Sequence, residues 1–403
     1  MISRTGTFPA HGVRTGYARR PARCISASLS ASENPMESRQ RRSIEVDFFR
    51  GIVLIVIVLD HIPGSVLSHV MLHAYALCDS AEVFVFLGGY ASAAAYMAVL
   101  ERSGAAAART RFFRRCWEIY RAYLLTAILT LLSGAILALL RLNHPMLDLS
   151  GWQPFAAHPI RTAFDILTLR RQPYLSSVLP MYVIFALFVP LAVPLARRSA
   201  VAALACSIGI WWFAPLLASM FSMDDVGDWA FNPFAWQLMF VLGMVCRLHP
   251  VSAVRMTSSA GQWLTRIAFA VVVAFAVVKL FVLVQPLPGA MKQHLSLVRV
   301  VNFGAIAWLA AYCVARGAVA RLAQRLPAVI TVGRTGLVCF VGGTLISLVV
   351  DTATPHGWHG LAGFLAALAG DFAAIAAMLA LAKTWRDWRG PHTRAAVQGA
   401  RIG

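Results

Sequence analysis

IEVDFFRGIVLIVIVLDHIP, running from Ile44 to Pro63, is the stretch of this sequence that decides the fold class. Its nine residues 51–59 have no polar side chain, and they separate Arg50 from Asp60 and His61. A helix turns about 100° per residue, so the eleven steps from Arg50 to His61 return to within about 20° of the same face. The two side chains then lie roughly 16 Å apart along the axis, about half the hydrocarbon thickness of a bilayer.

This geometry makes His61 a candidate functional residue. A helix that holds Arg50 at one membrane surface places His61 near the midplane, where an ionisable side chain is costly and is retained mainly for function. Asp47 precedes Arg50 by three residues and can pair with it on the same helix face.

The composition identifies a polytopic membrane protein. Hydrophobic residues make up 59% of the 403 positions and charged residues only 13%, whereas roughly a quarter of the residues in a soluble domain are charged. The seven cysteines are odd in number and form no C-x-x-C pair. We therefore expect neither a disulfide framework nor a metal site.

The positive charge follows a topological pattern. Of the 36 Lys and Arg residues, 29 fall in the segments that are cytoplasmic if the N-terminus is inside, so the net charge of +19 reflects the positive-inside rule and not nucleic-acid binding. We predict an all-α fold of about ten transmembrane helices with both termini in the cytoplasm. The apolar runs lie at about 50–70, 80–100, 118–140, 174–196, 200–220, 234–252, 264–285, 298–318, 328–350 and 361–383.

Three regions follow from this pattern. Residues 1–43 are rich in Ser, Ala and Arg and read as a disordered basic cytoplasmic extension, residues 44–385 form the membrane domain, and residues 386–403 form a short cytoplasmic tail. Met36 stands just before the first charged helix, which leads to the hypothesis that translation starts there and not at Met1.

The second span begins with two carboxylates. Asp79 and Glu82 lie on one face at its outer end, and Glu82 needs a partner there, for which His61 is the candidate. Gly88 and Gly89 follow, and we interpret them as sites where helices pack closely.

The loop before the third span is the most basic one. Topology alone explains its arginines, but guanidinium groups also suit the phosphates of a nucleotide-bearing donor such as coenzyme A. Arg115 and Tyr120 enter the span and extend such a site inward. The arginines are Arg102, Arg109, Arg111, Arg114, Arg115 and Arg121.

A later outer segment is aromatic. Trp229, Phe231, Phe234 and Trp236 fit an interfacial belt or a platform on which a sugar stacks. Asn232 suits a turn before the next span, and Gln237 begins that span as a polar group facing protein.

These residues resemble the OpgC family of the membrane acyltransferase-3 superfamily over roughly residues 38–385. The first helix carries R-x-x-E-x-D-x-x-R-G, with His61 after ten residues that follow Arg50. Two departures are Gly88, where the family often has serine, and Tyr123, where a histidine is expected. The other shared patterns are S-A-E-x-F-V-F-L-G-G-Y at the second span, R-x-x-x-I-Y at Arg115–Tyr120, L-P-x-Y at Leu179–Tyr182 and N-P-x-x-W-Q at Asn232–Gln237.

The resemblance implies an enzyme of the bacterial inner membrane that moves an acyl group from cytoplasmic acyl-CoA to a carbohydrate hydroxyl outside. The OpgC branch is associated with succinylation of osmoregulated periplasmic glucans. We expect His61 to be the general base and Glu82 to stabilise the imidazolium. The expected catalytic residues are His61, Glu82, Arg50 and Asp47; the expected donor-binding residues are Arg50, Arg111, Arg114, Arg115 and Tyr120; the expected acceptor-binding residues are Asp79, Asn232, Trp236, Gln237 and Arg299.

A second class of function remains open at this stage. A polytopic transporter or glycan flippase would use the same buried charges as a proton relay without consuming acyl-CoA. The sequence does not decide whether the acyl group is succinyl or acetyl. It also does not decide whether the acceptor is a periplasmic glucan or another envelope carbohydrate.

Overall fold

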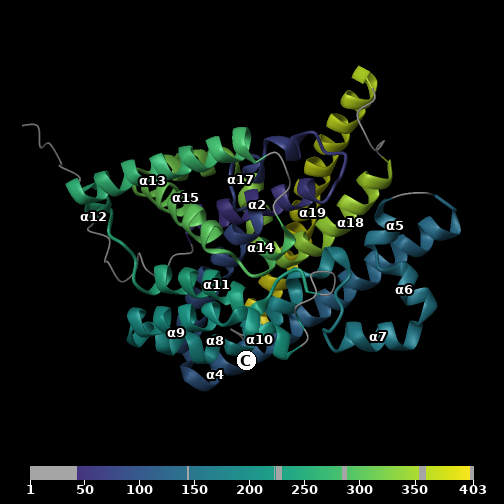
Figure 1. Ribbon diagram of the computed structural model, residues 1–403. Helices are drawn as coiled ribbons and strands as arrows, with labels where there is room; N and C mark the ends of the chain where they lie inside the picture. The colour runs from purple at the N-terminus through teal and green to yellow at the C-terminus, as the bar shows by residue number, and fades with distance from the viewer. Residues whose placement is uncertain are drawn as a thin grey trace, which may run out of the picture. The chain divides into compact units, whose positions relative to one another are not determined.

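The computed structural model describes residues 43–142, 145–221, 223, 229–283, 288–353 and 360–399, and these residues contain helices and no strand (Figure 1). The predicted extension and Met36 lie outside them, apart from Ser43, which caps the first described helix. The helices are α2 (Ile44–Asp60), η1 (Leu67–Val70), α3 (Leu72–Tyr75), α4 (Ser80–Leu139), α5 (Pro145–Leu149), α6 (Trp152–Ala157), α7 (Pro159–Leu167), η2 (Tyr174–Ser176), α8 (Val178–Arg198), α9 (Ala200–Trp212), α10 (Ala214–Met220), α11 (Pro233–Leu248), α12 (Ala253–Thr257), α13 (Ser259–Val277), η3 (Val278–Val282), α14 (Gly289–Gln293), α15 (Leu297–Ala315), α16 (Ala318–Arg325), α17 (Pro327–Arg334), α18 (Gly336–Ala353) and α19 (Gly360–Gly399).

The chain is a multi-pass helical membrane protein. Among the described residues, six helices are long and apolar enough to cross a bilayer, or seven if the α9–α10 pair, bent by 58°, forms one span. With 17 and 16 residues, α2 and α11 are only about 25 Å long, somewhat less than a typical hydrocarbon core. The predicted number of ten spans and the predicted orientation stay predictions.

Helix α4 contains two of the predicted spans. A straight helix of 60 residues would measure about 90 Å, three times the thickness of the hydrocarbon core. Gly104 breaks it with φ 80° and ψ 176°, a conformation that glycine adopts at little cost because it has no Cβ. The break falls between the runs predicted at 80–100 and 118–140.

Helix α2 packs against α17 and α18, while α4 packs against α8 and α11 (Figure 1). A Cβ on Gly51 would lie 2.0 Å from the carbonyl oxygen of Val329 in α17, and a Cβ on Gly89 would lie 1.9 Å from that of Phe240 in α11. Small residues thus let these backbones touch, as small residues do between helices in lipid. Gly88 also has a neighbour in contact, the Tyr182 hydroxyl, so packing accounts for both glycines of the second span.

Candidate active site

His61 follows the last residue of α2 and caps that helix. Its Nδ1 lies 2.6 Å from the carbonyl oxygen of Ile57, one turn earlier. A carbonyl oxygen can only accept, so Nδ1 carries the proton in this bond, and the neutral imidazole then holds its free lone pair on Nε2. The ring meets Tyr174 edge-on with a centroid distance of 5.6 Å, and Nε2 has no partner among the described residues. The neutral ring therefore presents a free proton acceptor.

One side of α2 runs along α18 from Arg50 to His61. A Cβ on Gly336 would lie 3.0 Å from a guanidinium nitrogen of Arg50, and further along Ser347 donates a hydrogen bond to the carbonyl oxygen of Val58 at 2.9 Å. His61 lines a cavity together with Ser347. Arg50 and His61 thus share the side that faces α18, as the eleven-residue spacing predicts.

The cavity between these two ends is narrow. Its volume is about 10 Å³, close to what a single water molecule needs. Leu54 and Phe340 are among the side chains that fill the space. A thioester arm would fit beside His61 only if α2 and α18 moved apart.

The start of α2 forms an ion pair with α17. Asp47 is buried, and its Oδ2 accepts a hydrogen bond from Nε of Arg334 at 3.1 Å. A Cβ on Gly333 would lie 1.8 Å from the Asp47 carbonyl oxygen, so α2 and α17 are in backbone contact here. The pairing of Asp47 with Arg50 stays a prediction.

Glu82 has a different partner from the one expected. Its side chain is fully buried, and Oε1 accepts a hydrogen bond from Nε of Arg299 in α15. Its other oxygen accepts the backbone N–H of Asp79 at 2.9 Å and completes a capping box at the start of α4. The expectation that Glu82 pairs with His61 is wrong, because a buried carboxylate is better satisfied by a guanidinium and a backbone donor than by an imidazole.

Asp79 joins this pair to a lysine that the sequence did not single out. Its Oδ2 lies 2.8 Å from Nζ of Lys292 and 3.1 Å from a guanidinium nitrogen of Arg299. Lys292 belongs to α14, a helix of five residues. Two carboxylates and two cations thus form one neutral cluster, defined by Asp79, Glu82, Lys292 and Arg299.

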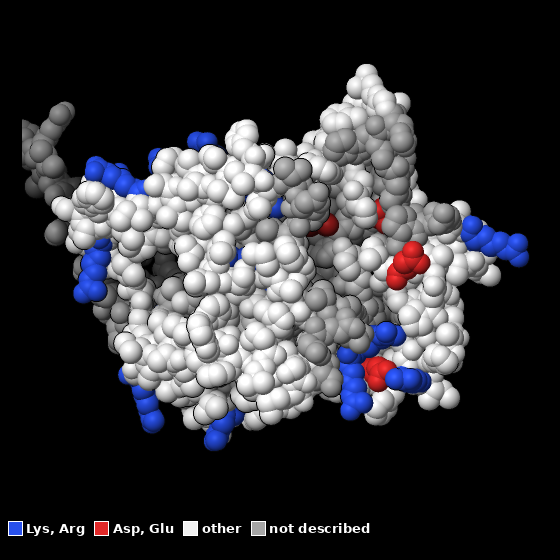
Figure 2. Space-filling model, in the orientation of Figure 1, with Lys and Arg blue, Asp and Glu red and all other residues white. Residues whose placement is uncertain are grey.

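A short chain of contacts links this cluster to His61. Ser80 Oγ donates to Oδ2 of Asp60 at 3.1 Å, and Asp60 immediately precedes His61. The other oxygen of Asp60 lies 3.4 Å from Nδ1 of His73. Figure 2 shows a few charged groups recessed in the otherwise uncharged middle of one face, with most Lys and Arg side chains toward its edge.

The segment from Asn232 to Gln237 begins α11 and uses its polar groups within the protein. Asn232 caps the helix and bonds the carbonyl oxygen of Ala214 at 2.9 Å. Trp236 donates through Nε1 to the carbonyl oxygen of Lys292 at 2.9 Å, and Gln237 exchanges two hydrogen bonds with Ser207. These residues support neighbouring segments, and their direct contact with an acceptor stays a prediction.

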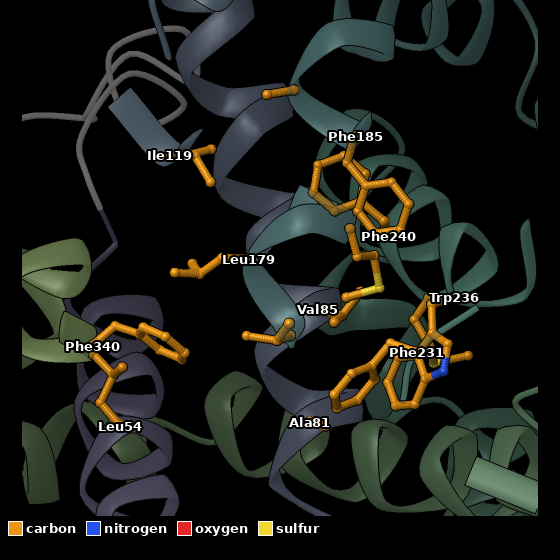
Figure 3. Close-up of a cluster of buried hydrophobic side chains, with 14 of the residues drawn as sticks. Leu54, Ala81, Val85, Ile119, Leu179, Phe185, Phe231, Trp236, Phe240 and Phe340 are labelled. Atoms are coloured by element: carbon orange, nitrogen blue, oxygen red, sulfur yellow. The ribbon is translucent and has the colours of Figure 1, made fainter. Parts of the chain in front are cut away.

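Three of the four aromatic residues of this segment are core residues, while Phe234 is partly buried. Trp229 and Phe231 are 2% and 8% exposed and Trp236 is fully buried, and Figure 3 shows Phe231 and Trp236 packed beside Ala81 at the start of α4. Both interpretations offered from the sequence, an interfacial belt and a sugar platform, are therefore wrong for these rings.

The family model described as OpgC protein matches residues 42–389, nearly the whole chain. The chain belongs to the OpgC family. No curated protein and no solved structure matches it.

In this OpgC family member, the predicted donor arginines lie on the second half of α4. Arg111 and Arg114 are exposed, and Arg115 pairs with Glu118 at 3.1 Å. Tyr120 donates to the carbonyl oxygen of Leu167 at 2.9 Å. An anion reaching this surface would meet Arg111 and Arg114 first.

The tyrosine in place of an expected histidine has a structural role in this OpgC protein. Tyr123 is buried, and its hydroxyl lies 2.9 Å from the carbonyl oxygen of Ile166 and 3.0 Å from that of Arg171. It thereby fixes the turn that leads to Tyr174, whose ring contacts that of His61. In the described part of the chain, no group of three His, Cys, Asp or Glu side chains has the arrangement of a metal site.

Proposed function

We propose that this OpgC family protein is an O-acyltransferase of the bacterial inner membrane. It takes an acyl group, succinyl in our expectation, from cytoplasmic acyl-CoA and moves it to a hydroxyl of a periplasmic glucan or another envelope carbohydrate. The observation that carries the proposal is the free Nε2 of His61, at the end of the helix whose start holds Arg50.

The proposed reaction has no acyl-enzyme. Nε2 of His61 removes the proton from the acceptor hydroxyl as the hydroxyl oxygen attacks the thioester carbonyl carbon. A tetrahedral intermediate forms and its C–S bond breaks, and the leaving thiolate takes the proton from the imidazolium. The carbonyl of Ile57 holds the ring in the required tautomer. Glu82, which the sequence led us to expect as the group that stabilises the imidazolium, is bound to Arg299 instead.

The donor enters at the other end of α2 in this proposal. Arg50 holds a phosphate of acyl-CoA or polarises its carbonyl, and Arg111 and Arg114 form an exposed positive surface on α4. Because the cavity beside His61 holds about one water, the acyl arm requires α2 and α18 to separate.

Thiol release tests the proposal directly. The purified protein in liposomes receives succinyl-CoA or acetyl-CoA with an envelope glucan fraction, and both free thiol and acylated glucan are measured. We expect acceptor-dependent thiol release that His61→Gln abolishes. His69→Gln is the matched control, since Nδ1 of His69 also bonds a carbonyl oxygen four residues earlier, that of Ser65 at 2.9 Å. Glucan transport without thiol release would instead identify a transporter or flippase.

A further inference from the structure

Helix α14 is fixed by hydrogen bonds from α9 and α11. Trp236 donates to the carbonyl oxygen of Lys292, and Asn232 donates through its backbone N–H to that of Gln293 at 3.1 Å. Trp211 donates to the carbonyl oxygen of Leu295 at 2.9 Å. A five-residue helix has little stability of its own, so these contacts hold the Lys292 backbone in place. The family motif at Asn232–Gln237 therefore serves to position α14.

The ammonium group of Lys292 is only partly used within the protein. It has three donors, and one of them faces Asp79. The side chain is 41% exposed, and Nζ lies 5.4 Å from the ring centroid of Phe231. Burial lowers the pKa of Lys292, while the charge of Asp79 and the hydrogen bond to Asp79 raise it. The raising effects together outweigh the effect of burial, so the pKa of Lys292 lies above its usual value. Lys292 is thus a fixed cation with donors to spare.

Arg299 does not share this freedom. Its side chain is 6% exposed and it already bonds Glu82 and Asp79. Arg299 neutralises Glu82 and also contacts Asp79. Asp79 is therefore paired with two cations, and Lys292 is only one of them.

Lys292 lies at the same end of the bundle as His61. Asp79, which bonds Lys292, is followed by Ser80, which bonds Asp60, the neighbour of His61. Lys292 is thus connected to the residue that precedes His61 through two consecutive residues, Asp79 and Ser80. A substrate that reaches Nε2 of His61 therefore enters the field of this ammonium.

We propose that Lys292 is a further catalytic residue, whose ammonium donates a hydrogen bond to the thioester carbonyl oxygen as that oxygen becomes negative. The inference rests on the acyl transfer proposed above. As His61 takes the hydroxyl proton and the new C–O bond forms, the carbonyl electron pair moves onto oxygen and Nζ stabilises it. When the C–S bond breaks, the pair returns to the carbonyl and the thiolate leaves with the proton from His61. A fixed donor is more effective here than water, because it needs no reorganisation during the reaction.

Substitution of Lys292 tests this role. We expect Lys292→Met to lower kcat by about 10²- to 10³-fold, as for the loss of one oxyanion donor, with the KM for acyl-CoA little changed. Lys279→Met is the matched control, because Lys279 is also half-buried and belongs to η3, next to α3. Retention of more than about a tenth of kcat in Lys292→Met would overturn the proposal.

Chemical rescue separates charge from folding. Lys292→Cys is treated with 2-bromoethylamine, which restores an ammonium group on a side chain close in length to lysine, and the modification is verified by mass spectrometry. We expect activity to recover at least tenfold, with wild-type protein treated in the same way as the reference. A modified protein that remains inactive would refute the role of the ammonium. Wild-type protein that releases no thiol from either acyl-CoA would refute the proposed function itself.

Discussion

Arg299 bonds Glu82 through Nε although the two residues are 217 positions apart in the chain. Both side chains are buried, Glu82 fully and Arg299 to 6% exposure. The bond connects the start of α15 to the first turn of α4. Arg299 also contacts Asp79, the N-cap residue of α4, at 3.1 Å. A buried pair of this kind is costly to break, because each partner alone would be an uncompensated charge.

We therefore expect Glu82→Gln to destabilise the protein by about 3–5 kcal/mol, the range for breaking a buried ion pair. Thermal unfolding in detergent, followed by tryptophan fluorescence, measures the change. The double variant Glu82→Leu/Arg299→Met should be more stable than either single variant, because it removes both charges together. A loss in the double variant equal to the sum of the two single losses would show that the two side chains are not coupled.

A second prediction concerns the separation of α2 from α18. A Cβ on Gly343 would lie 2.7 Å from Cγ2 of Val58, so the Cβ atoms of a Val58→Cys/Gly343→Cys pair fall within disulfide reach. We expect the oxidised double variant to lose acyl transfer and to regain it after reduction.

The single variants Val58→Cys and Gly343→Cys control for the substitutions themselves. Mass spectrometry after alkylation verifies that the disulfide has formed. Full activity of the locked protein would mean that the donor reaches His61 without movement between these helices.

Much of the fold was accessible from the sequence because it depends on local composition. The helix that begins at Ile44 and ends at Asp60 is the charged-then-apolar stretch itself. The region between the runs predicted at 118–140 and 174–196 contains three short helices, α5, α6 and α7, which the sequence analysis did not predict. These helices are too short to show the 3.6-residue hydrophobic period of a helix in the sequence. Pro145 and Pro159 stand at the starts of two of them, where proline is well tolerated.

The candidate site was harder to predict, because helix periodicity identifies a face but not the neighbour that covers it. The spacing correctly placed Arg50 and His61 on one side of α2. It gave no means to find Arg299 as the partner of Glu82, or Lys292 beside Asp79. One local signal was available: Asp79 and Glu82 have the three-residue spacing of a capping box, which already assigns one oxygen of Glu82 to the backbone.

A pH prediction follows from His73, which lies outside the spanning helices. The carboxylate of Asp60, whose Oδ1 lies 3.4 Å from Nδ1 of His73, raises the pKa of His73 above the usual value, against an opposing effect of partial burial. The protonated form of His73 is thus favoured in the folded state. Its contribution to the stability of the fold is complete below the unfolded-state pKa of His73, about 6.5, and is lost as the pH rises through the folded-state pKa.

We expect the melting temperature of wild-type protein to exceed that of His73→Asn most at about pH 6, and the difference to shrink by about pH 8. His69→Asn is the control, because Nδ1 of His69 lies 2.9 Å from a backbone carbonyl oxygen, that of Ser65. A difference between wild type and His73→Asn that is independent of pH would contradict the assigned charge.

Asp371 provides the last prediction. It is fully buried in α19, and its Oδ2 accepts the backbone N–H groups of Val66 and Leu67, each at 2.8 Å. These donors belong to the start of η1, five and six residues after His61, where first-turn N–H groups have no helical partner. Asp371 therefore anchors the segment that leaves His61.

Asp371→Ala leaves both donors unsatisfied in a buried site, which costs about 1–3 kcal/mol for each group. Asp371→Asn retains an oxygen acceptor in the same place and should lose much less. We expect amide hydrogen exchange at Val66 and Leu67 to accelerate in Asp371→Ala and to remain slow in Asp371→Asn. Asp387→Ala, at an exposed position of the same helix, should leave this exchange unchanged. If Asp371→Ala exchanged as slowly as wild type, the segment would be held by its own packing and not by the carboxylate.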